Sequence, residues 1–158
     1  MQFELTQTIT GHTGSVNCIA VLPEILATGS SDGTVIIYTS DPSNHYSRVQ
    51  TLRISPLYPL TLALYNNKDG VLLAIGGSSP HIHIYVSRFN PVSFTSVAIL
   101  KGHEDWIRGL DFTFTGNELT LASASQDRYV RLWRISPSSP TIINSNDLDA
   151  LFLPSHSR

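Results

Sequence analysis

Apolar residues over the first 135 positions gather in short runs, roughly four to eight residues long, between clusters of Gly, Ser, Asp and Asn. The runs are rich in Val, Ile, Leu and Tyr, a composition typical of strands. No segment keeps the 3.6-residue apolar period of an amphipathic helix. The pattern therefore predicts short strands and essentially no helix. The expected strands are 16–21, 26–30, 35–38, 49–52, 60–64, 71–75, 81–85, 97–100, 107–112, 119–123 and 129–135.

The expected strands recur with a fixed period, which indicates a repeat architecture. An apolar segment followed by small residues marks the second strand of each unit, and its alanines lie 47 and 48 residues apart. An aromatic residue ends the third strand of each unit at the same two spacings. The alanines are Ala27, Ala74 and Ala122, and the aromatic residues are Tyr38, Tyr85 and Trp133.

Three such units predict an all-β fold, a partial β-propeller of about three four-stranded blades. We expect residues 1–10 to be the last strand of a preceding blade. Residues 11–53 would form the first blade and residues 54–100 a degenerate second blade. Residues 101–144 would form the third blade, whose last strand is expected at 141–144, and residues 145–158 would form a polar tail or loop. Because a closed ring typically needs about four to eight blades, the chain is expected to be a fragment, or a truncated product, of a longer propeller protein.

A Gly-His pair at Gly11-His12 recurs at Gly102-His103. Each pair is followed, at similar spacing, by a hydroxyl residue in the second strand, an Asp in the next turn and an aromatic residue ending the third strand. This pattern resembles the WD-repeat family. The resemblance implies a structural hydrogen-bond set inside each blade, because a buried imidazole, hydroxyl or indole N–H needs a partner. Its members would be His12, Thr28, Asp32, His103, Ser123, Asp127 and Trp133.

The second unit lacks this set. Ile54-Ser55 stands where the Gly-His pair belongs, and Pro80 occupies the Asp region. We therefore expect the second blade to depend on apolar packing.

A narrower resemblance is carried by the run His-Glu-Asp-Trp-Ile-Arg-Gly-Leu at 103–110, by segments 121–127 and 130–133, and by 82–85. These segments are similar to the WD-repeat subunit two of the Elongator complex. The resemblance implies a non-catalytic scaffold in the machinery that modifies wobble uridines of tRNA. Its partners would be the Elongator scaffold and catalytic subunits, with an indirect or weak tRNA contact, in the cytoplasm and nucleus. No cofactor is predicted.

Two other functions remain as hypotheses: a different WD-repeat adaptor, such as a substrate receptor of a ubiquitin ligase, and an enzyme with an active site on the propeller. His103, Asp127 and Ser123 have the residue types of a catalytic triad. The first unit repeats the same types, however, and the chain has no Gly-x-Ser-x-Gly nucleophile motif. His81 and His83 alternate on one expected strand, but a metal site needs three or four ligands. We therefore predict no catalytic and no metal-binding residues.

Charge and hydropathy bear on whether the chain binds nucleic acid or membranes. Charged residues make up 14% of the chain and the formal net charge is -2, which does not indicate a dedicated nucleic-acid or membrane-surface protein. No run approaches the roughly 20 apolar residues that span a bilayer. Arg128, Arg131 and Arg134 form a basic cluster that is either a solvated strand edge or an RNA phosphate contact.

Aligning the two Gly-His units places Trp106 at the position of Ser15, Ile107 at the position of Val16 and Arg108 at the position of Asn17. We expect the first residue of the strand, Val16 or Ile107, to face the blade core, so that its neighbours point toward the upper rim. Trp and Arg are enriched at binding hot spots. The candidate partner contact is therefore Asp105, Trp106 and Arg108. The alternative is that the indole packs on a neighbouring blade and the guanidinium is only solvated.

Overall fold

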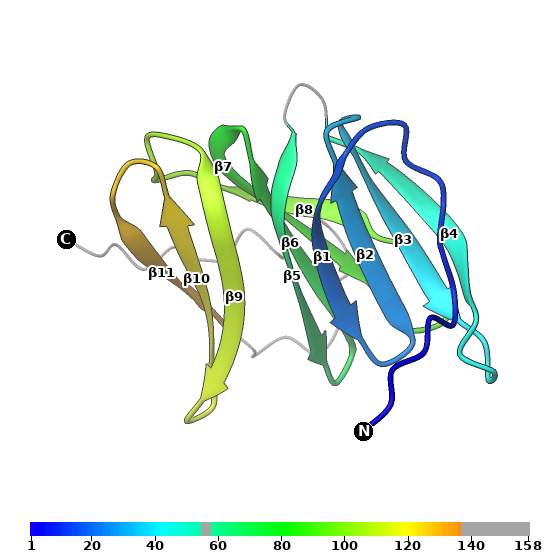
Figure 1. The fold of residues 1–158 in the computed structure, drawn as a ribbon. Coiled ribbons are helices and arrows are strands. Elements are labelled where there is room, and N and C mark those ends of the chain that lie inside the picture. Colours follow the sequence, from blue (N-terminus) through cyan, green and yellow to red (C-terminus); the bar gives the residue numbers. More distant parts are fainter. Residues whose placement is uncertain (55–57, 137–158) are drawn as a thin grey trace.

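A computed structural model describes residues 1–54 and 58–136 (Figure 1). The described residues contain strands and turns but no helix, as predicted. Within these described residues, eleven strands form three antiparallel sheets, each in sequence order. Blade one is β1 (Val16–Leu22), β2 (Ile25–Ser30), β3 (Thr34–Ser40) and β4 (Tyr46–Arg53). Blade two is β5 (Pro59–Asn67), β6 (Gly70–Gly77), β7 (Ser79–Ser87) and β8 (Thr95–Leu100). Blade three is β9 (Ile107–Thr115), β10 (Glu118–Ser125) and β11 (Val130–Ile135).

Every strand predicted between residues 16 and 135 is confirmed, with ends that differ by a few residues, whereas the strand predicted within residues 1–10 is not formed. The strand predicted at 141–144 and the tail at 145–158 lie outside the described residues. Turn chemistry explains several of the boundaries. Gly33, which precedes β3, has a φ of 82°, a left-handed conformation that glycine adopts without steric cost.

The three sheets fan out from their first strands, and β1, β5 and β9 lie side by side along the inner edge (Figure 1). Blade two is the middle layer. Because successive side chains of a strand point to opposite faces, β6 contributes Leu73 and Ile75 to the core shared with blade one. Its alternate residues Leu72 and Ala74 enter the core shared with blade three. Blade two is therefore held by apolar packing on both faces.

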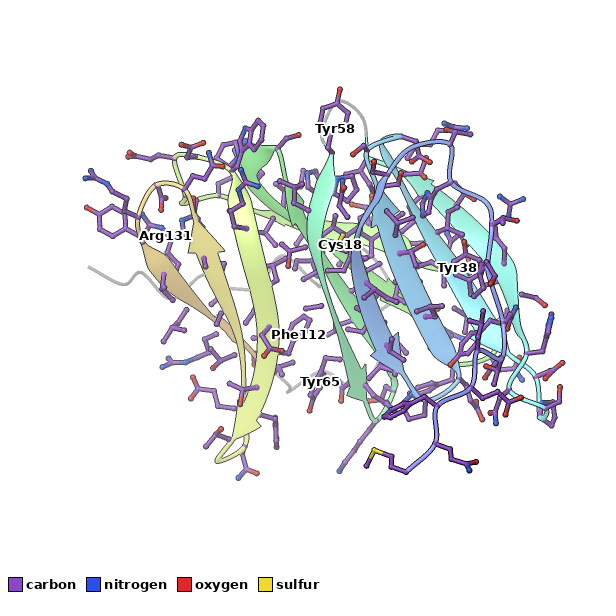
Figure 2. All side chains as sticks on the ribbon, in the orientation of Figure 1. Cys18, Tyr38, Tyr58, Tyr65, Phe112 and Arg131 are labelled. Atoms are coloured by element: carbon purple, nitrogen blue, oxygen red, sulfur yellow. The ribbon has the colours of Figure 1, made fainter. Side chains whose placement is uncertain are left out.

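The inner strands pack closely, and a small residue is required at one point. A methyl group added at Gly76 of β6 would lie 2.6 Å from Ile107 Cγ2 and 2.8 Å from Ile107 Cβ. Further along the same blade interface, Tyr65 of β5 and Phe112 of β9 make a tilted ring contact at 5.8 Å (Figure 2).

Residues 1–10 form no strand in this structure, and Phe3 is 90% exposed. Their position nevertheless follows the blade repeat. The Gln7 amide donates to the Tyr46 carbonyl at 2.9 Å and accepts from the Tyr46 N–H at 3.0 Å. Gln50 of β4 makes the same pair of bonds to Phe94 of blade two. Residues 1–10 thus contact blade one in the way that β4 contacts blade two. They do not, however, form the backbone hydrogen bonds of a strand.

The prediction that the first residue of each inner strand faces the blade core holds for Ile107, which is fully buried. It is wrong for Val16, which is 58% exposed. The same register shift occurs at both positions, but Ile107 packs against Gly76 of blade two. No described blade covers the corresponding face of β1, where Ile19 and Val21 are also exposed.

Candidate partner-binding surface

A chain of hydrogen bonds crosses the interior of blade three. His103 Nδ1 lies 2.7 Å from the Asp127 carboxylate, and His103 Nε2 lies 2.7 Å from Ser123 Oγ. The indole N–H of Trp133 donates to the same Ser123 oxygen at 2.8 Å. The imidazole and indole rings also meet edge to face at 6.4 Å. The structure therefore brings together all four residues predicted for this blade.

The proton positions in this chain follow from the donors and acceptors. An ionised carboxylate only accepts, so in a neutral imidazole Nδ1 donates to Asp127 and Nε2 accepts the Ser123 hydroxyl proton. Burial acts to raise the pKa of Asp127, but bonds from the Glu104 and Tyr129 amides and from His103 outweigh it and lower the pKa to about 2. The carboxylate is therefore ionised at neutral pH.

Blade one contains the same arrangement with one member changed. His12 lies 2.9 Å from Asp32 Oδ2 through Nδ1 and 2.8 Å from Thr28 Oγ1 through Nε2. Burial acts to raise the pKa of Asp32, yet bonds from Thr34, Thr13 and His12 hold it well below its usual range. Tyr38, which replaces the Trp of blade three, packs instead in an apolar cluster with Leu26, Ile36 and Tyr46.

Blade two, predicted to lack the set, has histidines on its third strand. His81 Nδ1 is buried without a hydrogen-bond partner among the residues described. Burial and the neighbouring His81 ring lower the pKa of His83. Within residues 1–54 and 58–136, no three His, Cys, Asp or Glu side chains are grouped to hold a metal ion.

The hydrogen-bond chain of blade three links the loop that contains His103 to the turn that contains Asp127. Ser123 is 1% exposed, and its hydroxyl bonds both His103 and Trp133. Asp127 also accepts from the Glu104 N–H at 3.0 Å. The segment that follows His103 is thereby held in place, and it carries the candidate contact residues.

Asp105, Trp106 and Arg108 form a single network with Gln126. The Arg108 guanidinium lies 5.4 Å from the centre of the Trp106 ring and donates through both Nε, at 2.7 Å, and Nη2 to the Gln126 amide oxygen. The Gln126 amide in turn donates to Asp105 at 3.3 Å. The structure therefore brings the three predicted contact residues together.

The two Gly-His units make corresponding hydrogen bonds here, as their alignment predicted. The Gln126 N–H donates to the Trp106 carbonyl at 2.9 Å, and in blade one the Ser31 N–H donates to the Ser15 carbonyl at the same distance. The side chains repeat as well, because Asn17 bonds Ser31 as Arg108 bonds Gln126. Blade three thus has larger side chains at positions that blade one fills with small polar ones.

Trp106 is 40% exposed and precedes β9, which begins at the same end of the fan as β1 and β5 (Figure 1). Tyr58, 52% exposed, stands at this end above β5 (Figure 2). We call Asp105, Trp106, Arg108 and Gln126 the rim cluster. Trp106, Arg108 and Gln126 are exposed and Asp105 is half-buried, at the end of the fan where β9 begins (Figure 1).

The structure does not gather the three arginines of the predicted basic cluster on one face. Arg131 lies on the same side of β11 as buried Trp133 and stacks 5.8 Å from the Tyr129 ring. Arg134 has the opposite strand parity and pairs with Glu118. Arg128 occupies a turn with a φ of 77°. Strand alternation thus places Arg131 and Arg134 on opposite faces of β11, so the three arginines do not form one patch.

Sequence reasoning missed two contributors. Gln126 was not singled out, although it directly precedes Asp127 as Ser31 precedes Asp32. The anchoring role of Gln7 was also missed. The signal for it was the shared triplet of Gln, Thr and an aliphatic residue, at 7–9 and again at 50–52.

Comparisons with known proteins agree with this architecture. The model of the WD domain, G-beta repeat family matches residues 3–39 and 94–134. The unmatched stretch between them holds most of blade two, which lacks the Gly-His pair. In the part of the chain that the structure describes, no helix is both long and apolar enough to cross a membrane.

The chain is also similar to proteins named Elongator complex protein 2. Identity is 34% over 157 residues with the Drosophila melanogaster protein, covering 90% of this chain and 20% of that protein. It is 38% over 124 residues with the Schizosaccharomyces pombe protein, covering 77% and 16%. It is 30% over 149 residues with the Homo sapiens protein, covering 87% and 18%. The chain thus spans about a fifth or less of the length of these relatives.

Two solved structures share the fold. The structure of U3-55K superimposes with a TM-score of 0.61 at 21% identity, over 78% of this chain and 37% of that one. The crystal structure of RRP9 WD40 repeats superimposes with a TM-score of 0.62 at 21% identity, over 94% and 41%. At this identity the likeness shows the WD40 propeller fold alone.

Proposed function

Because the chain belongs to the WD-repeat family and is similar along most of its length to Elongator complex protein 2, we propose that it is a non-catalytic scaffold subunit of the Elongator complex. In this role it supports modification of tRNA wobble uridines by holding other subunits rather than by performing chemistry. The proposal places the protein in the cytoplasm and nucleus. Its tRNA contact would be indirect or weak, through the assembly.

The observation that carries the proposal is the rim cluster. Its indole is exposed, yet the charged and amide groups around it are fixed by bonds within the cluster. A partner that docks here immobilises few additional side chains, which reduces the entropy lost on binding. The buried hydrogen-bond chain of His103, Ser123, Asp127 and Trp133 supports the loop from below.

The expected contribution of Trp106 follows from its exposed area. An indole side chain has about 250 Å² of surface, and 40% of the residue remains exposed. Covering about 100 Å² is worth about 2.5 kcal/mol at about 25 cal/mol per Å². This is an upper value for a partner contact, because binding also has entropic costs.

The test measures the affinity of the chain for the purified Elongator scaffold and catalytic subunits. We expect Trp106→Ala to raise Kd about tenfold or more, and Arg108→Gln to raise it by a smaller factor. Arg88→Gln changes an exposed arginine away from the rim and serves as the matched control. Thermal melting of each variant separates lost contact from lost stability.

Unchanged affinity in both rim variants would show that the partner site lies elsewhere. Affinity that falls only in step with thermal stability would show that Trp106 is a packing residue.

A further inference from the structure

A groove of about 510 Å³ opens on the side of blade one, between residues 11–13 and β4. We call it the lateral groove. Ile36 and Thr51 lie along it, and two exposed arginines, Arg48 and Arg53, also line it. It is separate from the rim cluster, which belongs to blade three.

A bulge in β4 places both arginines on this face. The β3–β4 register shifts between Ile37 and Tyr38, and Val49 is the extra residue of β4. Because side chains alternate along a strand, Arg48 and Arg53 would point to opposite faces of a regular strand. The bulge reverses the alternation once, so both guanidinium groups line the lateral groove.

The positive charge of these arginines is not balanced within the groove. Neither Arg48 nor Arg53 makes an ion pair or a side-chain hydrogen bond with the described residues. Asp32 is the one acidic residue among the described residues that line the groove. Its oxygens already accept bonds from His12, from the Thr13 N–H and from Thr34. Two guanidinium groups therefore remain available to an anionic ligand.

The neighbouring blade shows that this face of the outer strand stays partly exposed when another blade lies beside it. Blade two repeats the β4 bulge in β8, and in that register Ile99 is the counterpart of Thr51. Ile99 keeps 49% of its surface exposed, although blade one lies beside blade two. The counterpart of Arg48 in blade two is Ser96, so blade two lacks the arginine pair.

We propose that the lateral groove binds an extended acidic segment of a protein partner, with one carboxylate at Arg48 and a second at Arg53. The β3 residues opposite these arginines, Tyr38 and Thr34, are four positions apart, which is about 13 Å along a strand. Carboxylates at positions i and i+4 of an extended peptide have the same spacing and point to the same side. Arginine pairs with carboxylates in bidentate geometry, and Thr51 adds a hydroxyl between the two sites.

The lining favours a peptide over a nucleic acid. Among the described residues of the groove none is aromatic, so bases have no ring on which to stack.

The experiment uses fluorescein-labelled threonine-rich peptides and the full chain, followed by fluorescence anisotropy at low salt. One peptide carries two glutamates at i and i+4, a second carries them at i and i+3, and a third carries glutamines. We expect the first to bind most tightly and to weaken as salt screens the charges. Arg48→Gln and Arg53→Gln should each raise Kd about threefold to fivefold, as expected for exposed charge pairs. Arg88→Gln should leave it unchanged.

A charge reversal completes the test. Arg53→Glu should reject the acidic peptide and accept one with lysine at the matching position. Equal binding of the three peptides, or arginine variants that bind like the unmodified chain, would overturn the proposal. Tighter binding of an oligouridylate than of the acidic peptide, abolished by the same arginine substitutions, would also overturn the proposal. None of these outcomes depends on the rim cluster, so the scaffold proposal stands or falls separately.

Discussion

The substitution Ser123→Ala tests whether the hydrogen-bond chain of blade three is structural. The change removes one oxygen that bonds two buried groups, His103 Nε2 at 2.7 Å and Trp133 Nε1 at 2.8 Å. The histidine is 5% exposed and the tryptophan 3%, so solvent does not readily replace the lost partner. Both polar groups are left unsatisfied inside the blade.

The magnitude follows from these two orphaned groups. A buried donor or acceptor left without a partner costs about 1–3 kcal/mol. Two of them give an upper range of about 2–6 kcal/mol. Small relaxations, or a water in the space of the hydroxyl, would keep the measured loss in the lower half of that range. Such a loss is a large fraction of the 5–15 kcal/mol that is typical for a whole domain.

The assay is denaturant unfolding of the full chain, followed by tryptophan fluorescence. Ser96→Ala, on an exposed position of β8, is the matched control and should not move the midpoint. Adding Trp133→Phe to Ser123→Ala should cost less than the sum of the single changes, because each single change orphans the partner of the other. A midpoint for Ser123→Ala equal to that of Ser96→Ala would refute the structural interpretation.

Two further predictions concern blade packing and pH. Gly76→Ala should destabilise the chain by about 1–3 kcal/mol in thermal melts, because its methyl would press on Ile107 between blades two and three. Gly109→Ala is the control and should have little effect, because an added methyl there meets only an ordinary 3.6 Å contact. The pKa of Asp127 is lowered from 3.8 to about 2 in the fold, so its stabilisation is complete above about pH 4 and is lost as the pH falls toward 2. Melting temperatures between pH 5 and 2 should therefore fall less steeply for Asp127→Asn than for the unmodified chain, and parallel curves would contradict the assigned role.

The strands and the hydrogen-bond chains were predictable because each depends on local, repeated information. Alternating apolar residues fix a strand, and residue types at a constant spacing identify His103, Ser123, Asp127 and Trp133 as one group. The same spacing identified Trp106 as the enlarged counterpart of Ser15 at the start of the inner strand.

What the sequence did not reveal depends on neighbours and register. Ile107 is buried because it packs on Gly76 of blade two, whereas no described blade covers the equivalent Val16. The sequence of one strand does not say whether a neighbouring blade covers it. Residues 1–10 form no ladder, although the Gln7 side chain anchors them as Gln50 anchors β4. The shared face of Arg48 and Arg53 depends on the bulge at Val49, which strict alternation would have excluded.

The central claim is that this chain assembles with Elongator. The most direct measurement is purification of the tagged, unmodified chain from its own cells under gentle conditions, followed by size exclusion and quantitative mass spectrometry of the peak. The account predicts that the Elongator scaffold and catalytic subunits co-elute with the chain in a constant ratio across the peak. A chain that elutes without them, or with another complex in constant ratio, would contradict it.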